Sequence, residues 1–251
     1  MALKLSKIYT GLSGLQLPGP QATYPPAFQG KSRLKYYAHL FNSIEINSSF
    51  YKTPQPKTVS KWGDSTPGDF KFTFKLSKVI THSKGLEYDE KELENFMNSI
   101  SEIGDKKGCL LIQFPGSIRI DKLDKLQQLL SDIEWHNKGK WQLAVEFRHP
   151  SWYENETTEI LNEYNAVTVV QDKPAAATPA YLPQYKAVYL RLHGPYGNYR
   201  GSYTDADLQR FATNILTWQL KGKTVYCYFN NTMGSALQNL QTLNGFLENP
   251  D

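Results

Sequence analysis

Charged and polar side chains recur at the C-terminal ends of strand-like apolar runs in this chain of 251 residues, and eight such runs follow one another along it. In the fifth run Glu146 and Arg148 alternate with apolar residues, and in the seventh Arg191 and His193 do the same. Because successive side chains point to opposite faces of a strand, each of these pairs shares one face. The pattern predicts proton transfer chemistry beside a site for an anion.

Three carboxylates are the candidate acids and bases. Glu45 in the second run, Glu146 in the fifth and Asp172 in the sixth could exchange protons with a substrate as catalytic groups. The competing interpretation is that Glu45 and Glu146 only anchor Arg148 and Arg191, since a buried charge is costly unless it is paired. The sequence gives no distance between the carboxylates, and both interpretations stay open.

The basic side chains are the candidate substrate-binding groups. Arg148, Arg191 and Lys75 could clamp a phosphate or carboxylate. They could instead belong to an internal salt-bridge network, because such networks place the same residue types together. His193 is the candidate catalytic proton shuttle, since imidazole changes its charge near neutral pH.

Two further residues, His149 and Asn230, are assigned to substrate binding on weaker grounds. His149 precedes a proline, which favours an extended backbone, and its side chain could simply hold the loop. Asn230 could orient a ligand hydroxyl or cap the helix that follows. His82, in the loop after the third run, has no assigned role.

A metal site is a further alternative. The three carboxylates and His193 are ligand types that suit several divalent ions. The two arginines expected beside them would compete for the carboxylates and repel a cation. The chain has no H-x-H or H-E-x-x-H spacing, no C-x-x-C pair and no glycine-rich phosphate fingerprint after the first run. We therefore expect neither a metal nor another cofactor.

Strand-like runs alternate with helical patterns, and these elements must position the polar residues. The runs cover residues 7–14, 43–50, 70–77, 109–115, 142–150, 166–172, 187–194 and 224–231. Helical periodicity covers residues 31–41, 55–63, 87–103, 121–133, 155–164, 204–220 and 234–247, whereas 173–186 is irregular. Such alternation favours parallel strands, and eight of them favour a TIM-like (β/α)8 barrel over an open sheet. We expect one α/β domain over residues 1–251.

The composition restricts the partners of the protein. A formal net charge of +4 permits an anionic ligand, but no dense run of Lys and Arg is present, so a nucleic acid is only weakly supported. No segment reaches the roughly 18 apolar residues of a membrane span or forms a signal peptide. We expect a cytoplasmic protein with a small anionic ligand and no membrane partner. The sequence does not specify an oligomeric state.

Several motifs resemble those of the YecE-like family, domain of unknown function family 72. They are EINSSFY (45–51), F-x-F-x-x-K (70–75), LIQFP (111–115), VEFRHPSW (145–152), YLRLHG (189–194) and YFNN (228–231). The resemblance implies a single TIM-like barrel and carries no established activity. It places all the candidate residues above on motif positions. One departure is GLSGL after the first run, where the family has a G-T-S-G-W-like segment.

Three functions fit these observations. The leading hypothesis is a metal-independent hydrolase or lyase that acts on a polar anion such as a phosphorylated sugar or nucleotide fragment. The second is a metal-dependent phosphodiesterase-like or DNA-binding barrel, which rests on analogy of fold alone. The third is a non-catalytic binding barrel whose charges hold a ligand or stabilise the fold.

Overall fold

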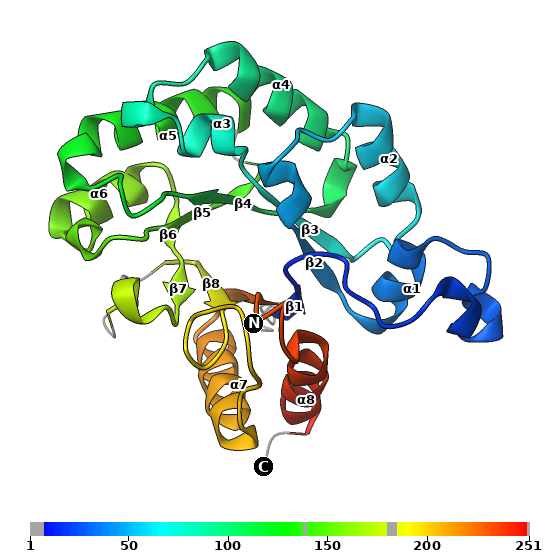
Figure 1. The fold of residues 1–251 in the computed structure, drawn as a ribbon. Coiled ribbons are helices and arrows are strands. Elements are labelled where there is room, and N and C mark those ends of the chain that lie inside the picture. Colours follow the sequence, from blue (N-terminus) through cyan, green and yellow to red (C-terminus); the bar gives the residue numbers. More distant parts are fainter. Residues whose placement is uncertain (1–7, 138–139, 180–184, 250–251) are drawn as a thin grey trace, which may run out of the picture.

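Parallel strands lie at the centre of the molecule, and helices cover their outer side (Figure 1). The structure is a computed structural model that describes residues 8–137, 140–179 and 185–249. The strands are β1 (Ile8–Leu12), β2 (Ser43–Ile46), β3 (Lys71–Lys75), β4 (Lys107–Gln113), β5 (Gln142–Glu146), β6 (Val167–Thr168), β7 (Val170–Gln171), β8 (Ala187–Leu192) and β9 (Thr224–Phe229). The helices are α1 (Arg33–Leu40), α2 (Pro56–Asp64), α3 (Lys78–Thr81), α4 (Glu90–Ser101), α5 (Leu123–Asn137), α6 (Asn155–Glu163), α7 (Asp205–Leu220) and α8 (Ala236–Glu248).

The strands form two parallel sheets, with the orders β1-β9-β8-β7 and β2-β3-β4-β5-β6. The predicted α/β class with parallel strands is confirmed. The sixth run is not the single strand that we expected, because Val169 separates β6 from β7 and the two pieces pair with different neighbours. At the other junction, Ser13 and Glu45 form an isolated bridge just after β1. The described hydrogen bonds therefore give two sheets with adjoining edges rather than one continuous ladder.

Seven of the helices occur where the periodicity predicts them, with ends shifted by a few residues, and α3 is an addition. Thr204 and Asp207 form the capping box expected at the start of α7. Between β7 and β8 the described residues contain only a 3-10 turn over Pro174–Ala176, in agreement with the irregular stretch predicted there. Within the described part of the chain, no helix is both long enough and apolar enough to cross a membrane.

Two buried clusters lie on opposite sides of the strands. The outer cluster packs the helices on the strands and includes Phe70, Phe72 and Phe74, as the alternation in the third run predicts. The inner cluster is rich in tyrosine and lies among the strands of both sheets. Inside it the Tyr228 hydroxyl lies 2.6 Å from Ser43 Oγ and 2.8 Å from Thr73 Oγ1. This hydrogen-bonded layer lies inside the strands, beneath the charged residues at the strand ends.

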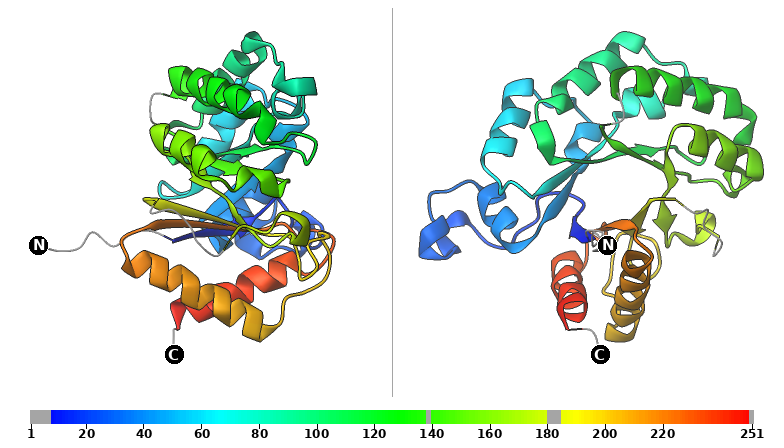
Figure 2. Two further views of the ribbon diagram at one scale, coloured as in Figure 1. Left: turned by 90° about the vertical axis from the view of Figure 1, so that its left-hand side faces the viewer. Right: turned by 180° about the vertical axis from the view of Figure 1, so that it is seen from behind.

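The carboxyl ends of the strands converge on one face of the molecule, which faces the reader in Figure 1. The views in Figure 2 show α7 and α8 side by side, against the sheet that contains β1, β9 and β8. Helices α1 to α6 form an arc around the other sheet. The loops that follow β1, β2, β3, β5 and β8 open on the shared face, and the candidate site residues lie at their bases.

A candidate anion site beside a buried ion-pair network

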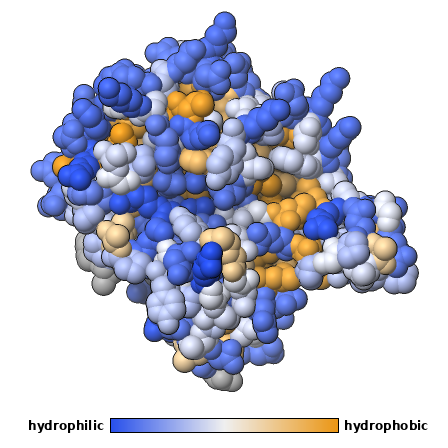
Figure 3. Space-filling model, in the orientation of Figure 1, coloured by the Kyte–Doolittle hydropathy of each residue, from blue (hydrophilic) through white to orange (hydrophobic). Residues whose placement is uncertain are grey.

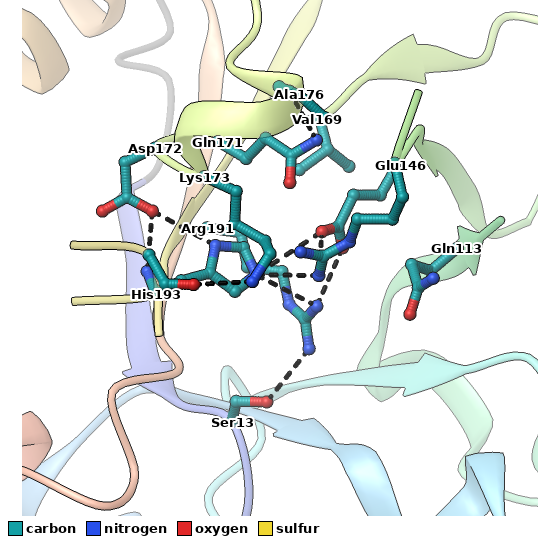
Figure 4. A network of polar contacts seen from close by, with 12 residues as sticks. Ser13, Gln113, Glu146, Val169, Gln171, Asp172, Lys173, Ala176, Arg191 and His193 are labelled. Atoms are coloured by element: carbon teal, nitrogen blue, oxygen red, sulfur yellow. Dashed lines mark hydrogen bonds and ion pairs between the residues drawn. The ribbon is translucent and has the colours of Figure 1, made fainter. Parts of the chain in front are cut away.

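Arg191 on β8 lies at the centre of a buried ion-pair network (Figure 4), and its side chain is only 1% exposed. Its Nε and Nη2 donate to the two carboxylate oxygens of Glu45 at 3.1 and 2.7 Å, and its Nη1 donates to Glu146 Oε2 at 2.8 Å. A planar guanidinium can bridge two carboxylates in this way because it has donors on more than one edge. Glu45 and Glu146 lie on one sheet and Arg191 on the other, so the network ties the two sheets together.

The Glu45 carboxylate is saturated with donors. Besides Arg191, it accepts hydrogen bonds from the Ser13 hydroxyl and from the Tyr189 hydroxyl. Burial by itself would raise the pKa of Glu45, but the charge of Arg191 and these hydrogen bonds outweigh burial and hold the pKa below its ordinary value. Glu45 is therefore ionised at neutral pH and is a poor proton donor.

Glu146 is held in the same way by two arginines. Its Oε2 faces Arg191, and its Oε1 forms an ion pair with Arg148 Nη2 and lies 3.4 Å from His193 Nε2. Burial would raise the pKa of Glu146, yet the charges of the two arginines hold it well below the usual range. The geometry thus favours the interpretation that Glu45 and Glu146 anchor arginines.

His193 is fixed between Asp172 and Arg148. Asp172 Oδ1 accepts from the His193 backbone N–H at 2.8 Å and lies 3.2 Å from Nδ1, while Nε2 lies 3.0 Å from Arg148 Nη2. The Tyr203 hydroxyl donates to Asp172 Oδ2 and accepts from the backbone N–H of Gly194 at 2.6 Å. An imidazole that donates from Nδ1 to Asp172 can accept at Nε2 from Arg148. We call the set Ser13, Glu45, Glu146, Asp172, Tyr189, Arg191, His193 and Tyr203 the Arg191 network.

Two neighbouring cations, Arg148 and Lys75, are less completely paired with carboxylates and hydrogen-bond acceptors. Arg148 is paired only through Nη2; its Nη1 is buried and has no hydrogen-bond partner among the described residues. The Lys75 side chain is buried at the end of β3, and in the described part of the chain no carboxylate oxygen lies within 4.0 Å of its Nζ. Its Nζ lies 3.9 Å from the centre of the Phe50 ring. Burial, and then the charge of Arg191, lower the pKa of Lys75 to about 7.

His82 completes a second group, which we call the cationic cluster: Lys75, Arg148 and His82. The His82 ring contacts the ring of Phe50, with centroids 4.9 Å apart, so Lys75 and His82 both contact this phenylalanine. Although much of His82 is exposed, partial burial and the charges of Lys75 and Arg148 lower its pKa below the ordinary value. Three groups that carry or can carry positive charge therefore lie near one another, and among the described residues only Arg148 is paired with a carboxylate.

Two of the predicted binding residues lie elsewhere. His149 Nδ1 accepts from the backbone N–H of Ser151 at 3.1 Å and caps the short turn Pro150–Trp152. Asn230 is buried just after β9, where its backbone N–H bonds to the Leu192 carbonyl at 2.6 Å. Among the described residues, neither side chain forms a hydrogen bond or ion pair with the Arg191 network. His149 supports the loop after β5.

Four contributors to the site were not picked out from the sequence. Tyr189 shares a face with Arg191 by alternation, and Ser13 follows β1 directly, so the same sorting by face could have found both. Tyr203 belongs to the loop after β8 that is rich in glycine and tyrosine. No sequence signal links Phe50 with Lys75, because this contact depends on how the turn after β2 lies against β3.

The carboxylate and imidazole side chains of the site are not arranged like the ligands of a metal ion. Among the residues that the structure describes, no group of three or more His, Cys, Asp or Glu side chains is arranged to hold an ion. Each carboxylate of the Arg191 network already faces a guanidinium, an imidazole or a phenol. A divalent cation would have to displace these donors.

Apolar side chains border the charged centre on one side. Leu15, Tyr51 and Val79, in the segments after β1, β2 and β3, are 37%, 67% and 50% exposed. Figure 3 shows apolar residues gathered over β2 and the segment that leads to α1, next to polar residues at the centre. Tyr51 connects this surface to the cationic cluster, because its ring contacts the ring of Phe50, on which the Lys75 amine lies.

Comparison with known proteins gives a consistent result. A family model described as "Protein of unknown function DUF72" matches residues 9–250. The protein YecE of Escherichia coli K12 is 29% identical over 157 residues, which cover 62% of this chain and 54%, about half, of that protein. YunF of Bacillus subtilis 168 is 26% identical over 259 residues, which cover 90% of this chain and 89% of YunF. The crystal structure of a DUF72 family protein of Thermotoga maritima superposes with a TM-score of 0.76 at 25% identity, over 96% of this chain and 99% of that one.

Proposed function

The chain belongs to the family of proteins of unknown function DUF72, and we propose that it is an enzyme that binds a small polar anion at the cationic cluster. It would act as a metal-independent lyase or hydrolase on a phosphorylated or carboxylated compound. We infer that the two sheets work as one TIM-like barrel, whose enzymes place their sites at the carboxyl ends of the strands. The candidate site lies at this end.

The supporting observation is the buried Nη1 of Arg148, which has no partner among the described residues. A buried donor without an acceptor costs about 1–3 kcal/mol, and more when it is charged. Lys75, unlike Arg148, has no carboxylate oxygen within 4.0 Å of its Nζ among the described residues. A bound phosphate or carboxylate oxygen would satisfy both groups, whereas a neutral ligand would leave their charge uncompensated. Arginine suits this role because its planar donors match the oxygens of such anions.

The same cluster offers a group for proton transfer. The Lys75 amine, with its pKa lowered to about 7 by burial and by Arg191, can exist in both protonation states under physiological conditions. Glu45 and Glu146 would then position arginines rather than exchange protons. His193 would hold Arg148 in place through its Nε2. This assignment moves the proposed acid–base role from the carboxylates to Lys75.

Calorimetric titration with inorganic phosphate and pyrophosphate at low salt tests the proposal. We expect measurable binding by the native protein and a loss of at least about tenfold in affinity, about 1.4 kcal/mol, in Arg148→Met. Arg148→Lys should retain part of the affinity, since it keeps the charge but loses the planar donors. The matched control is Arg210→Met, because Arg210 is exposed on α7. The proposal fails if neither anion binds, or if the two methionine variants bind equally well.

A non-catalytic role is the second candidate, and the Arg191 network favours it. All its carboxylates are paired without any ligand, so these charges need no substrate to explain their presence. The protein would then bind an anion without transforming it. Loss of binding in Arg148→Met with no turnover of any anion in a broad substrate screen would favour this second candidate.

A further inference from the structure

Lys75 is a mostly buried residue, and in the described part of the chain no carboxylate oxygen lies within 4.0 Å of its amine. Its side chain is 6% exposed, and the Ser49 hydroxyl donates to the Lys75 carbonyl at 2.7 Å, which ties the end of β3 to the turn after β2. The Phe50 ring lies against Nζ. A cation–π contact of this kind replaces only part of the hydration that a buried ammonium loses. The surroundings therefore favour the neutral amine over the ammonium.

Charged groups of both signs surround this amine from several elements. Arg191 on β8 and Arg148 after β5 lower the pKa of Lys75, whereas Glu146 on β5 and Glu45 on β2 raise it. The pKa of His82, after α3, is itself lowered, so His82 adds little positive charge at neutral pH. Both anions are already paired with arginines, and burial, the largest cause, lowers the pKa of Lys75 in spite of them. A neutral amine beside a guanidinium with an unused buried donor is an arrangement that suits attack on an electrophile with an anionic group.

We propose that Lys75 is a nucleophile that forms an imine with the carbonyl carbon of an anionic aldehyde or ketone whose anionic group is held by Arg148. This inference rests on the proposed function and narrows its substrate to oxo acids or phosphorylated carbonyl compounds. The Lys75 nitrogen lone pair forms the new C–N bond. Both hydrogens of the amine leave with the carbonyl oxygen as water, and the C=N bond takes the place of the C=O bond. No oxidant, reductant or metal is needed for this step.

The ionisation of Lys75 is consistent with this role. With a pKa of about 7, set by burial first and by Arg191 second, roughly half of the amine is free to attack at neutral pH. For an exposed lysine with an ordinary pKa, roughly one amine in two thousand is neutral at that pH. Lys75 should therefore react with carbonyl compounds much faster than exposed lysines in the same molecule, even though it is less accessible.

The test uses glyoxylate, a small aldehyde that carries a carboxylate, with sodium cyanoborohydride to reduce the imine to a stable secondary amine. Peptide mass spectrometry of the folded protein at pH 7 measures the rate of modification at each lysine. We expect Lys75 to be modified at least about tenfold faster than Lys91, an exposed residue at the start of α4. Equal or slower modification of Lys75 would overturn the inference.

Two further comparisons, with acetaldehyde as the reagent and with the variant Arg148→Met, distinguish a failure of the imine proposal from a failure of the anion site on which it rests. Acetaldehyde has no anionic group, so Arg148→Met should slow the modification of Lys75 by glyoxylate at least about fivefold and leave that by acetaldehyde nearly unchanged. If phosphate binds through Arg148 but neither aldehyde modifies Lys75 preferentially, the imine is wrong and the anion site stands. If both aldehydes modify Lys75 equally fast in both proteins, the amine is reactive, but the anionic substrate class is wrong.

Discussion

The Arg191 network and the cationic cluster contain the same kinds of residue within one charged centre, yet they differ in how their charges are balanced. In the network each carboxylate faces a guanidinium, an imidazole or a phenol, and the central guanidinium makes contacts on all sides. In the cationic cluster Arg148 keeps a buried donor unused and Lys75 has no described carboxylate partner. Charge that is balanced inside the protein can stabilise the fold without a ligand. Charge that is left unbalanced destabilises the fold, and a ligand of opposite sign would remove that cost.

The largest effect should come from removing the centre of the network. Arg191→Met leaves Glu45 and Glu146 buried with much of their positive partner gone, and breaking a buried pair in this way costs about 3–5 kcal/mol. We expect the free energy of unfolding, measured by urea denaturation, to fall by that amount. Arg210→Met, at an exposed pair on α7, should change it by less than about 0.5 kcal/mol. If the free energy of unfolding of Arg191→Met decreased by less than about 1 kcal/mol, the network would not have the stabilising role that we assign to it.

A smaller change of opposite sign is expected at Lys75. Its pKa in the folded protein, about 7, lies below that of an unfolded lysine, so the unfolded chain binds the proton more tightly and the native protein is destabilised at low pH. The cost is complete below pH 7 and vanishes as the pH rises past about 10.4. Lys75→Met, which keeps the apolar stem, should therefore be more stable than the native protein by up to about 4 kcal/mol at pH 6, and no more stable near pH 10.5.

Urea denaturation of both proteins across this pH range measures the difference. Lys91→Met provides the matched control, because an exposed amine should show no such dependence. If Lys75→Met were less stable than the native protein at pH 6 and no closer to it at pH 10.5, Lys75 would have a stabilising partner and would belong to the network.

Alternation along the strands predicts which residues of one strand share a face. The face shared by Glu146 and Arg148, and that shared by Arg191 and His193, follow from the two-residue period of a strand, and all four meet at the strand ends. The helices follow from the spacing of apolar residues in the same way. These features depend on local geometry, which the sequence contains directly.

The pairing of the charges depends on distances between strands and could not be predicted in the same way. Arg191 reaches Glu45 because the two sheets adjoin near Ser13, and no local pattern in the chain encodes that approach. The break at Val169 also arises between strands, since its backbone N–H still bonds to the Val145 carbonyl on β5, whereas Val170 and Gln171 pair with β8. For the same reason, the sequence grouped Lys75 with the arginines as an anion clamp and gave no sign that its own charge is unbalanced.

Titration of the Lys75 amine tests most directly whether charge in the cationic cluster is left unbalanced, in contrast to charge in the Arg191 network. Lysines labelled with 13C at the ε-carbon can be followed by NMR from pH 5 to pH 11 in the folded protein, with the Lys75 resonance assigned by its loss in Lys75→Met. We predict a midpoint near 7 for Lys75, because burial and Arg191 disfavour its charge. Addition of phosphate should raise this midpoint, since a bound anion stabilises the ammonium. A midpoint above about 9.5 without any anion would show that the charge of Lys75 is balanced within the protein. This result would contradict the distinction between the cationic cluster and the Arg191 network.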